Sequence, residues 1–121
     1  MRYLCAVYLE PTTMEKLSPA EGATLDRDSI AYDDELRRSG HYIVSDALKR
    51  ATTSKTLRVR NGKLSITDGP FAETKEQLGG FILVEARNMD EAVQLASKIP
   101  MAKHGTIEVR PVMELSSKSK S

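Results

Sequence analysis

The densest group of chemically useful side chains lies between residues 68 and 81. This segment reads Asp-Gly-Pro-Phe-Ala-Glu-Thr-Lys-Glu-Gln-Leu-Gly-Gly-Phe and is flanked by strand-forming residues on both sides. Asp68 stands before Gly69-Pro70, so its carboxylate could act as a general base or could accept the backbone amides of a turn. Asp68 is therefore the candidate catalytic residue, with the turn-holding role as the alternative.

The rest of this segment supplies candidate ligand-binding side chains. Lys75 lies near Glu73 and Glu76 in the sequence, and the three could form a polar wall around a substrate. The alternative is a solvated loop laced by weak ion pairs. Phe71 is predicted to anchor the loop in the core. If the loop folds over a cleft between sheet and helix, its charges would be partly desolvated and chemically more useful.

The remaining candidates predict no metal, cofactor or nucleophile. His41 and His104 have no second His, Cys or carboxylate at metal-ligand spacing. Cys5 lies in a predicted strand with no adjoining basic residue, so it is expected to be a small buried apolar side chain. Gly79-Gly80 leads into a strand and not a helix, which excludes a phosphate-binding loop and favours a bulge or a close backbone contact.

Two helices are predicted from caps and periodicity. Ser18-Pro19-Ala20-Glu21 has the form of a capping box with proline at the first helical position, and Gly40 supplies a stop. Helical spacing inside this segment is shown by Leu25, Ser29, Tyr32 and Leu36. Asn88 can cap a second helix, with Glu91 three residues later, and Pro100 ends it. Its predicted buried stripe consists of Ala92, Leu95, Ala96 and Ile99.

Strands are predicted at 2–9, 41–48, 81–86 and 106–112, and residues 68–80 are expected to form a polar turn. Residues 57–60 and 63–67 alternate around Asn61-Gly62, which predicts a β-hairpin with positive φ at both turn positions. The register of that hairpin places Arg58, Arg60 and Lys63 on one face. This basic face could bind an anion or a partner, or could protect an edge from aggregation.

The order β-α-β, hairpin, β-α-β predicts an α+β fold, a ferredoxin-like sandwich with an added β-hairpin. Two helices cover one face of such a sheet, yet the strands at 2–9 and 81–86 carry apolar residues on both faces. We therefore expect a homodimer whose sheets pack face to face into a dimeric α+β barrel. The alternative is that the first and last loops of the chain fold over the sheet.

Composition narrows the function classes. The chain has 121 residues, with 18 Lys+Arg against 17 Asp+Glu, a net charge of +1 and a single cysteine. With a net charge this close to zero, the chain has no long-range electrostatic field that would attract nucleic acid or an anionic membrane. With a single cysteine, no internal disulfide can form. The first apolar run, residues 3–9, is too short for a signal peptide, so a cytoplasmic location is expected. A single domain is predicted over residues 1–113, followed by a disordered tail at 114–121.

The 68–81 segment closely resembles the signature of the DGPF family, which belongs to the YCII-related proteins. Further agreement comes from the first strand onward from Tyr3, Asp34-Glu35-Leu36-Arg37, Val59-Arg60-Asn61-Gly62-Lys63 and Ile107-Glu108-Val109-Arg110-Pro111-Val112. The resemblance implies a ferredoxin-like fold that dimerises into an α+β barrel, and it implies no particular reaction. A His and an Asp that line a cleft have been proposed as an acid/base pair in the wider group. In this chain Tyr32 or a neighbour stands where that histidine is expected.

Two functional hypotheses follow. The first is a homodimeric small-molecule-binding or regulatory module, with Tyr32, Phe71, Glu73, Lys75 and Glu76 around the ligand. The second is a small-molecule enzyme that uses Asp68 as a base, assisted by Tyr32, Glu73 or Lys75, in a cleft lined by the 68–81 segment. One scaffold hosts many functions, so the fold does not choose between them.

Overall fold

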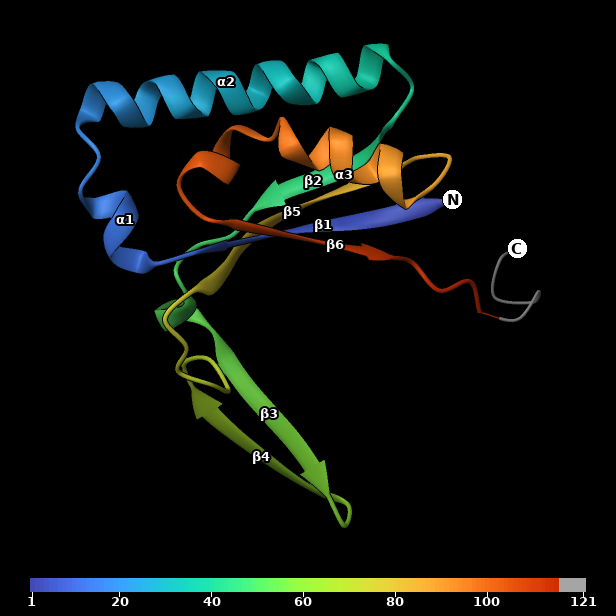
Figure 1. Ribbon diagram of the computed structural model, residues 1–121. Helices are drawn as coiled ribbons and strands as arrows, with labels where there is room; N and C mark the ends of the chain where they lie inside the picture. Colours follow the sequence, from blue (N-terminus) through green and yellow to red (C-terminus); the bar gives the residue numbers. More distant parts are fainter. Residues whose placement is uncertain (116–121) are drawn as a thin grey trace.

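The computed structural model describes residues 1–115, and these residues form a four-stranded antiparallel sheet with helices on one face (Figure 1). The strands are β1 (Arg2–Leu9), β2 (Tyr42–Ala47), β5 (Gln77–Glu85) and β6 (Thr106–Pro111), in the spatial order β2-β5-β1-β6. The longer helices are α2 (Pro19–Arg38) and α3 (Met89–Ser97). The predicted ferredoxin-like α+β fold is therefore confirmed. Residues 116–121 of the predicted tail lie outside the described residues.

The shorter elements join these layers. They are the helix α1 (Pro11–Glu15), the 3-10 turns η1 (Ala51–Thr53) and η2 (Pro100–Lys103), and the hairpin strands β3 (Lys55–Arg60) and β4 (Lys63–Asp68). No helix is predicted from the sequence at α1, whose local signal is limited to Pro11 at the first helical position. No helix among residues 1–115 is long and apolar enough to cross a membrane.

Helix α2 begins and ends as its sequence predicts. The Ser18 hydroxyl accepts a hydrogen bond from the Glu21 amide at 3.1 Å, and the Glu21 carboxylate accepts one from the Ser18 amide at 2.8 Å. At the other end, Gly40 adopts φ +81°, which lets the His41 amide donate to the Leu36 carbonyl at 2.9 Å. These caps fix a long helix across the sheet.

The core lies between the helices and one face of the sheet. It is built from Tyr3, Cys5, Tyr32, Leu36, Ile82, Val84, Ala86, Ala92, Ala96 and Ile99, all less than 9% exposed. Tyr32 and Leu36 come from the predicted stripe of α2, and Ala92 and Ala96 from that of α3. The hydrogen bond from the Glu91 amide to the Asn88 side chain, at 2.9 Å, confirms the predicted cap of α3.

Strand β5 is longer than its sequence suggests. It begins at Gln77 and not at Phe81, because Gly79 and Gly80 belong to the strand. The pairing with β1 runs from Val7–Gly80 to Tyr8–Leu78, so Gly79 is the extra residue of a bulge. A Cβ at Gly80 would lie 2.9 Å from the Asp46 carbonyl oxygen. Both expectations for this glycine pair, a bulge and a close backbone contact, are confirmed.

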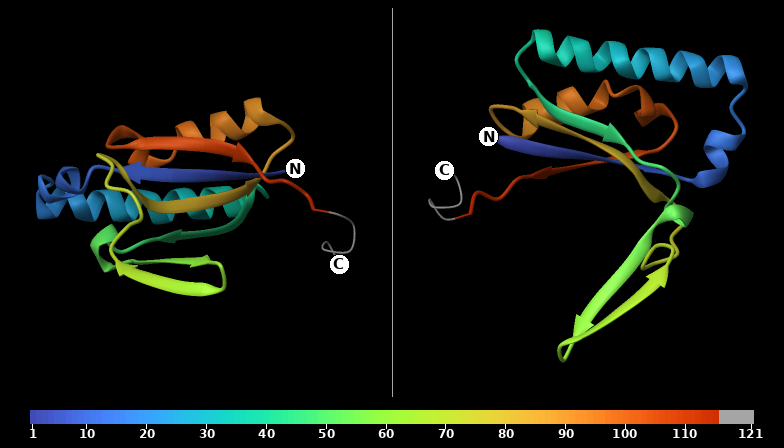
Figure 2. Two further views of the ribbon diagram at one scale, coloured as in Figure 1. Left: turned by 90° about the horizontal axis from the view of Figure 1, so that it is seen from below. Right: turned by 180° about the vertical axis from the view of Figure 1, so that it is seen from behind.

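The hairpin of β3 and β4 projects from the sheet on the side away from the helices (Figure 1). Figure 2 shows that it leaves the sheet where β2 ends and β5 begins. Asn61 and Gly62 have φ of 53° and 73°, which confirms the predicted turn. Arg60 pairs with Lys63 and Arg58 with Ser65, so the three basic side chains do share one face.

Candidate functional site

Asp68 lies at the base of the hairpin, on the surface of the chain. Its carboxylate pairs with the Lys55 ammonium group at 2.6 Å, and the two side chains are 84% and 70% exposed. The adjoining backbone closes the hairpin base: the Gly69 amide donates to the Ser54 carbonyl at 2.7 Å, and the Thr56 hydroxyl donates to the Gly69 carbonyl at 2.8 Å. Among residues 1–115, Asp68 thus has an ion pair across the hairpin and a carboxylate that faces solvent.

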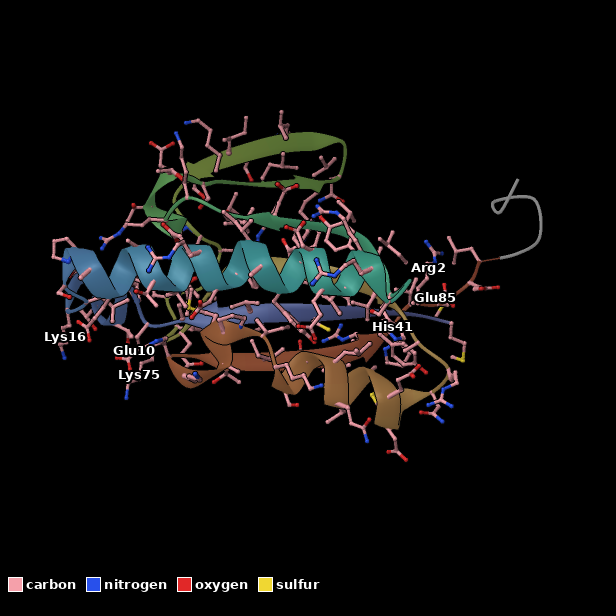
Figure 3. The ribbon with its side chains drawn as sticks, turned by 90° about the horizontal axis from the view of Figure 1, so that it is seen from above. Arg2, Glu10, Lys16, His41, Lys75 and Glu85 are labelled. Carbon is pink, nitrogen blue, oxygen red and sulfur yellow. The ribbon has the colours of Figure 1, made fainter. Side chains whose placement is uncertain are left out.

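Two of the other three charged residues of the 68–81 segment also face solvent, and Glu76 is half-buried. Glu73 and Lys75 are exposed, and within residues 1–115 no ion pair joins Lys75 to Glu73 or Glu76. In Figure 3 Lys75 lies at the same end of the molecule as Glu10 and Lys16. Within one chain, the loop therefore does not gather these side chains around a common point.

The expectation that Phe71 anchors this loop in the core is wrong. Its side chain is 78% exposed. The loop is held by polar contacts instead, because the Gln77 side-chain amide donates to the Thr74 carbonyl at 2.8 Å and the Thr74 hydroxyl donates to the Glu76 carbonyl at 2.7 Å. An exposed phenylalanine on a polar-held loop leaves an apolar side chain free for contact with another molecule.

Tyr32 is the one predicted site residue that reaches the interior. Its hydroxyl donates a hydrogen bond of 2.6 Å to the Leu95 carbonyl in α3. Burial, and to a smaller extent the charge of Glu35, raises the pKa of this hydroxyl to about 12. The hydroxyl therefore stays protonated at neutral pH, and its proton is already engaged by the backbone.

Tyr32 borders a cavity of about 470 Å³ between α2 and the sheet. Helix α2 contributes Asp26, Ser29, Ile30 and Asp33, which share one stripe because they are spaced by three, four and seven residues. The apolar part of the lining comes from Val7, Leu9, Ile82, Ile99, Pro100 and Met101. A volume of this size is typical of small-molecule sites, and the cavity combines an apolar interior with a few polar groups.

The polar wall of the cavity is held by a chain of hydrogen bonds. The Ser45 hydroxyl donates to the Asp33 carboxylate at 2.9 Å, and the Tyr42 hydroxyl lies 2.9 Å from the same Ser45 oxygen. The Tyr42 ring in turn lies beneath the Arg37 guanidinium, with 4.2 Å between the guanidinium carbon and the ring centroid. Asp33 is thus fixed in position by groups from the edge strand β2.

The charge of this lining has one sign. Asp26, Asp33 and Asp46 border the cavity, and no Lys, Arg or His of the described residues lines it. His41 is bound through Nδ1 to the Glu85 carbonyl at 2.8 Å, and His104 lies beside a separate groove with Glu21. An apolar cavity with an acidic rim favours a ligand that carries an apolar body and a cationic or hydrogen-bond-donating group.

Gly79 and Gly80 shape the floor of the cavity. A Cβ at Gly79 would meet the Leu9 side chain at 2.8 Å, and a Cβ at Gly80 would meet the Asp46 backbone. The only element of the 68–81 segment that reaches the cavity is therefore its last part, residues 79–81.

The chain is similar to known proteins in both sequence and fold. The model of the YCII-related domain family matches residues 1–116. The chain belongs to the YCII-related family. An uncharacterised protein of Rhizobium meliloti is 34% identical over 114 residues, which cover 93% of this chain and 92% of that protein. The match therefore extends over most of both chains.

A solved structure shares the fold of this YCII-related protein. It is a 5-chloro-2-hydroxyhydroquinone dehydrochlorinase from Burkholderia phenoliruptrix, in complex with 2,5-dihydroxybenzoquinone. The two structures superpose with a TM-score of 0.56 over 95% of this chain and 96% of the other, at 17% sequence identity. At this identity the likeness shows the fold alone.

Sequence reasoning missed the acidic rim of the cavity. Neither Asp26 nor Asp33 was singled out from the sequence as a candidate site residue, and Ser45 was not connected with the helix. Their i, i+7 spacing does put both carboxylates on one stripe. What the sequence does not show is that this stripe lies above β2 and the start of β5.

Proposed function

We propose that this YCII-related protein is a homodimeric small-molecule-binding module whose ligand occupies the cavity between α2 and the sheet. The observation that carries the proposal is the Asp33 carboxylate, which is oriented by Ser45 at the rim of an apolar cavity of about 470 Å³. A fixed acceptor beside apolar walls supplies both parts of small-molecule recognition, namely an apolar body and an oriented polar contact.

The sign of the charge sets the ligand class. Because Asp26, Asp33 and Asp46 line the cavity and no cation of residues 1–115 does, a cationic group on the ligand would gain attraction, and an anionic one would be repelled. We therefore expect a ring-sized ligand with an amine or with several hydrogen-bond donors.

A pair of matched probes tests this expectation. Tyramine and 4-hydroxyphenylacetate share a phenol ring and differ in the charge of their side arm. Tyramine is expected to raise the melting temperature of the wild type, since a ligand that binds only the native state stabilises it by mass action. Asp33→Asn should remove that shift, and Asp68→Asn should retain it. Equal shifts from both probes, or a shift that survives Asp33→Asn, would contradict the proposed cavity.

The dimer part of the proposal is supported by the uncovered face of the sheet. On this face, which we call the open face, Leu83 pairs with Leu4 on one side and Val44 on the other, and Phe81 pairs with Ala6. Cross-strand partners point to the same side, so these five side chains form a contiguous apolar surface. No helix of the described part of the chain lies over it (Figure 2). A second copy of the chain carries the same apolar surface, so the open faces of two copies can pack against each other.

A second candidate is a small-molecule enzyme that works by acid/base chemistry. The favouring observation is again geometric, because a carboxylate held by a hydroxyl at a cavity rim is a suitable general base. Asp33 takes that role within one chain. Asp68 would act as the general base only in a cleft that a second copy completes, since one chain leaves Asp68 exposed. The same cleft would be lined by Phe71, Glu73, Lys75 and Glu76. Loss of turnover in Asp68→Asn but not in Asp33→Asn would favour the cleft between copies.

A further inference from the structure

The hairpin of β3 and β4 has one apolar face that its own chain leaves uncovered. Leu57 pairs with Ile66 and Val59 with Leu64, so the four side chains share a face. They are 62%, 55%, 57% and 60% exposed, respectively. Among residues 1–115 the two strands contact each other far more than any other element. We call these four side chains the apolar face of the hairpin.

A hairpin with an uncovered apolar face is unusual in a protein that stays monomeric. Isolated two-stranded hairpins are marginally stable in water and need a further layer against an apolar face. Four large side chains, each more than half exposed on one short ribbon, also form a patch of the kind that marks contact with another molecule. The apolar face therefore requires an occupant.

Charge indicates what that occupant is. The hairpin, residues 55–68, has four basic residues and one acidic residue, which leaves +3. Helix α2 has six acidic and three basic residues, which leaves −3. In one chain the two lie on opposite sides of the sheet, so they cannot neutralise each other (Figure 1). A second copy of the chain would bring a helix of the complementary charge to the hairpin.

The two edges of the sheet differ in a way that locates the contact. The residues of edge strand β6 that share the side of the open face are polar: Thr106, Glu108 and Arg110. The other edge strand, β2, exposes Ile43 and Val44, with Leu48 directly after it. Strand β2 also lies next to the acidic stripe of α2, because Ser45 is bonded to Asp33. The edge at β2 combines apolar and acidic groups, which match the two faces of the hairpin.

We infer that the hairpin clasps a second copy of the chain, with its apolar face on the partner's β2 edge and Arg58, Arg60 and Lys63 directed to the partner's α2. This rests on the dimer of the proposed function. With two sheets packed face to face, a hairpin that projects beyond the open face passes the partner's sheet edge and reaches its helical layer.

Hydrogen exchange of the wild type tests the clasp without any substitution. Amides of residues 55–68 are expected to be protected at high protein concentration and to lose protection on dilution, in step with dissociation measured by sedimentation velocity. A dimer whose hairpin amides exchange equally fast at every concentration overturns the clasp and leaves the dimer intact. A chain that stays monomeric at all concentrations overturns both.

A variant gives a second, independent test. Replacing Leu57, Val59, Leu64 and Ile66 by Thr keeps strand-forming residues but removes most of the apolar surface. The dissociation constant of the dimer should rise by about tenfold or more. The matched control, Val93→Thr on the outer side of α3, should leave it unchanged. An unchanged dissociation constant in the fourfold variant contradicts the clasp, and circular dichroism at equal concentration confirms that the sheet and helices are retained.

Salt provides a check on the charge argument. Arg58→Gln, Arg60→Gln and Lys63→Gln together should weaken the dimer at low ionic strength and make its dissociation constant less sensitive to salt than that of the wild type. Identical salt dependence in the two proteins contradicts the contact with the partner's α2.

Discussion

The Ser45 hydroxyl donates a hydrogen bond of 2.9 Å to the Asp33 carboxylate and so ties edge strand β2 to helix α2. Both residues line the same cavity, and the Tyr42 hydroxyl extends the chain of hydrogen bonds. The contact thus links the packing of the helix on the sheet to the orientation of the one carboxylate best placed to meet a ligand.

Ser45→Ala should reduce both stability and binding. The substitution removes a hydrogen bond to a charged, half-buried acceptor, and such bonds contribute about 1.5–3 kcal/mol. Urea denaturation should show a loss of roughly that size, and the tyramine-induced shift should shrink because Asp33 loses its orientation. Thr53→Ala is a suitable control, because its hydroxyl bonds only the nearby Arg50 carbonyl in an exposed turn. If Ser45→Ala is as stable as Thr53→Ala, the hydrogen bond from Ser45 to Asp33 does not stabilise the fold.

Tyr32→Phe should change how stability depends on pH. The folded chain raises the pKa of the Tyr32 hydroxyl from its ordinary value of 10 to about 12, because the ring is buried. The folded state thus holds this proton more tightly, so the stabilisation is complete below pH 10 and is lost as pH rises toward 12. At pH 8 the variant should be about 1 kcal/mol less stable, through loss of the bond to Leu95. By pH 11 the gap in the free energy of unfolding should narrow. A gap that is constant between pH 8 and 11 would contradict this pKa shift.

Cys5 should be inert in the folded protein. It is 1% exposed, and burial raises the pKa of its thiol to about 11. At pH 8 only about a thousandth of the thiol would be ionised, and reagents need the thiolate. A chromogenic disulfide reagent should give no fast signal until urea unfolds the chain. Because Cys5 is the only cysteine, Cys5→Ala supplies the blank. Rapid reaction of the native protein would show that the strand opens locally.

Local signals in the sequence predict local structure well in this chain. The capping box at Ser18 and the Asn61-Gly62 turn are each confirmed, because their residues satisfy the backbone within a few positions. The start of β5 was missed for the converse reason. Gly79 and Gly80 also fit a turn, and only the pairing with β1 shows that the strand continues through their bulge to Gln77.

The site was harder to predict than the fold, because its residues meet only through tertiary packing. Asp33 and Ser45 lie on different elements, and nothing local indicates which side of α2 faces β2. Conversely, the 68–81 segment is dense in charge, yet Asp68 and Phe71 are exposed in a single chain. The polar residues concentrated in this segment therefore lie on an exposed surface of the chain and not in its cavity.

Two glycine substitutions should have opposite effects on stability. A Cβ at Gly105 would lie 2.2 Å from the Tyr8 carbonyl oxygen, so Gly105→Ala must push β6 away from β1. Such overpacking costs about 1–3 kcal/mol or more. A Cβ at Gly22 in α2 would meet nothing within 4 Å, so Gly22→Ala should stabilise the helix by about 0.5–1 kcal/mol. Thermal denaturation of both variants measures these effects. Equal melting temperatures would contradict the close approach at Gly105.

Leu83→Glu should abolish the proposed dimer while leaving the fold of the chain intact. Leu83 lies in the middle of the open face, between Leu4 and Val44, and is half-buried in one chain. A carboxylate there still reaches water in the monomer, but it would be desolvated without a partner between two packed sheets, which costs several kcal/mol. Sedimentation should therefore find a monomer with an unchanged circular dichroism spectrum. Val93→Glu, on the outer surface of α3, adds the same charge away from the sheet and should remain dimeric. If Leu83→Glu sediments like the Val93→Glu control, the open face is not the surface through which two chains associate.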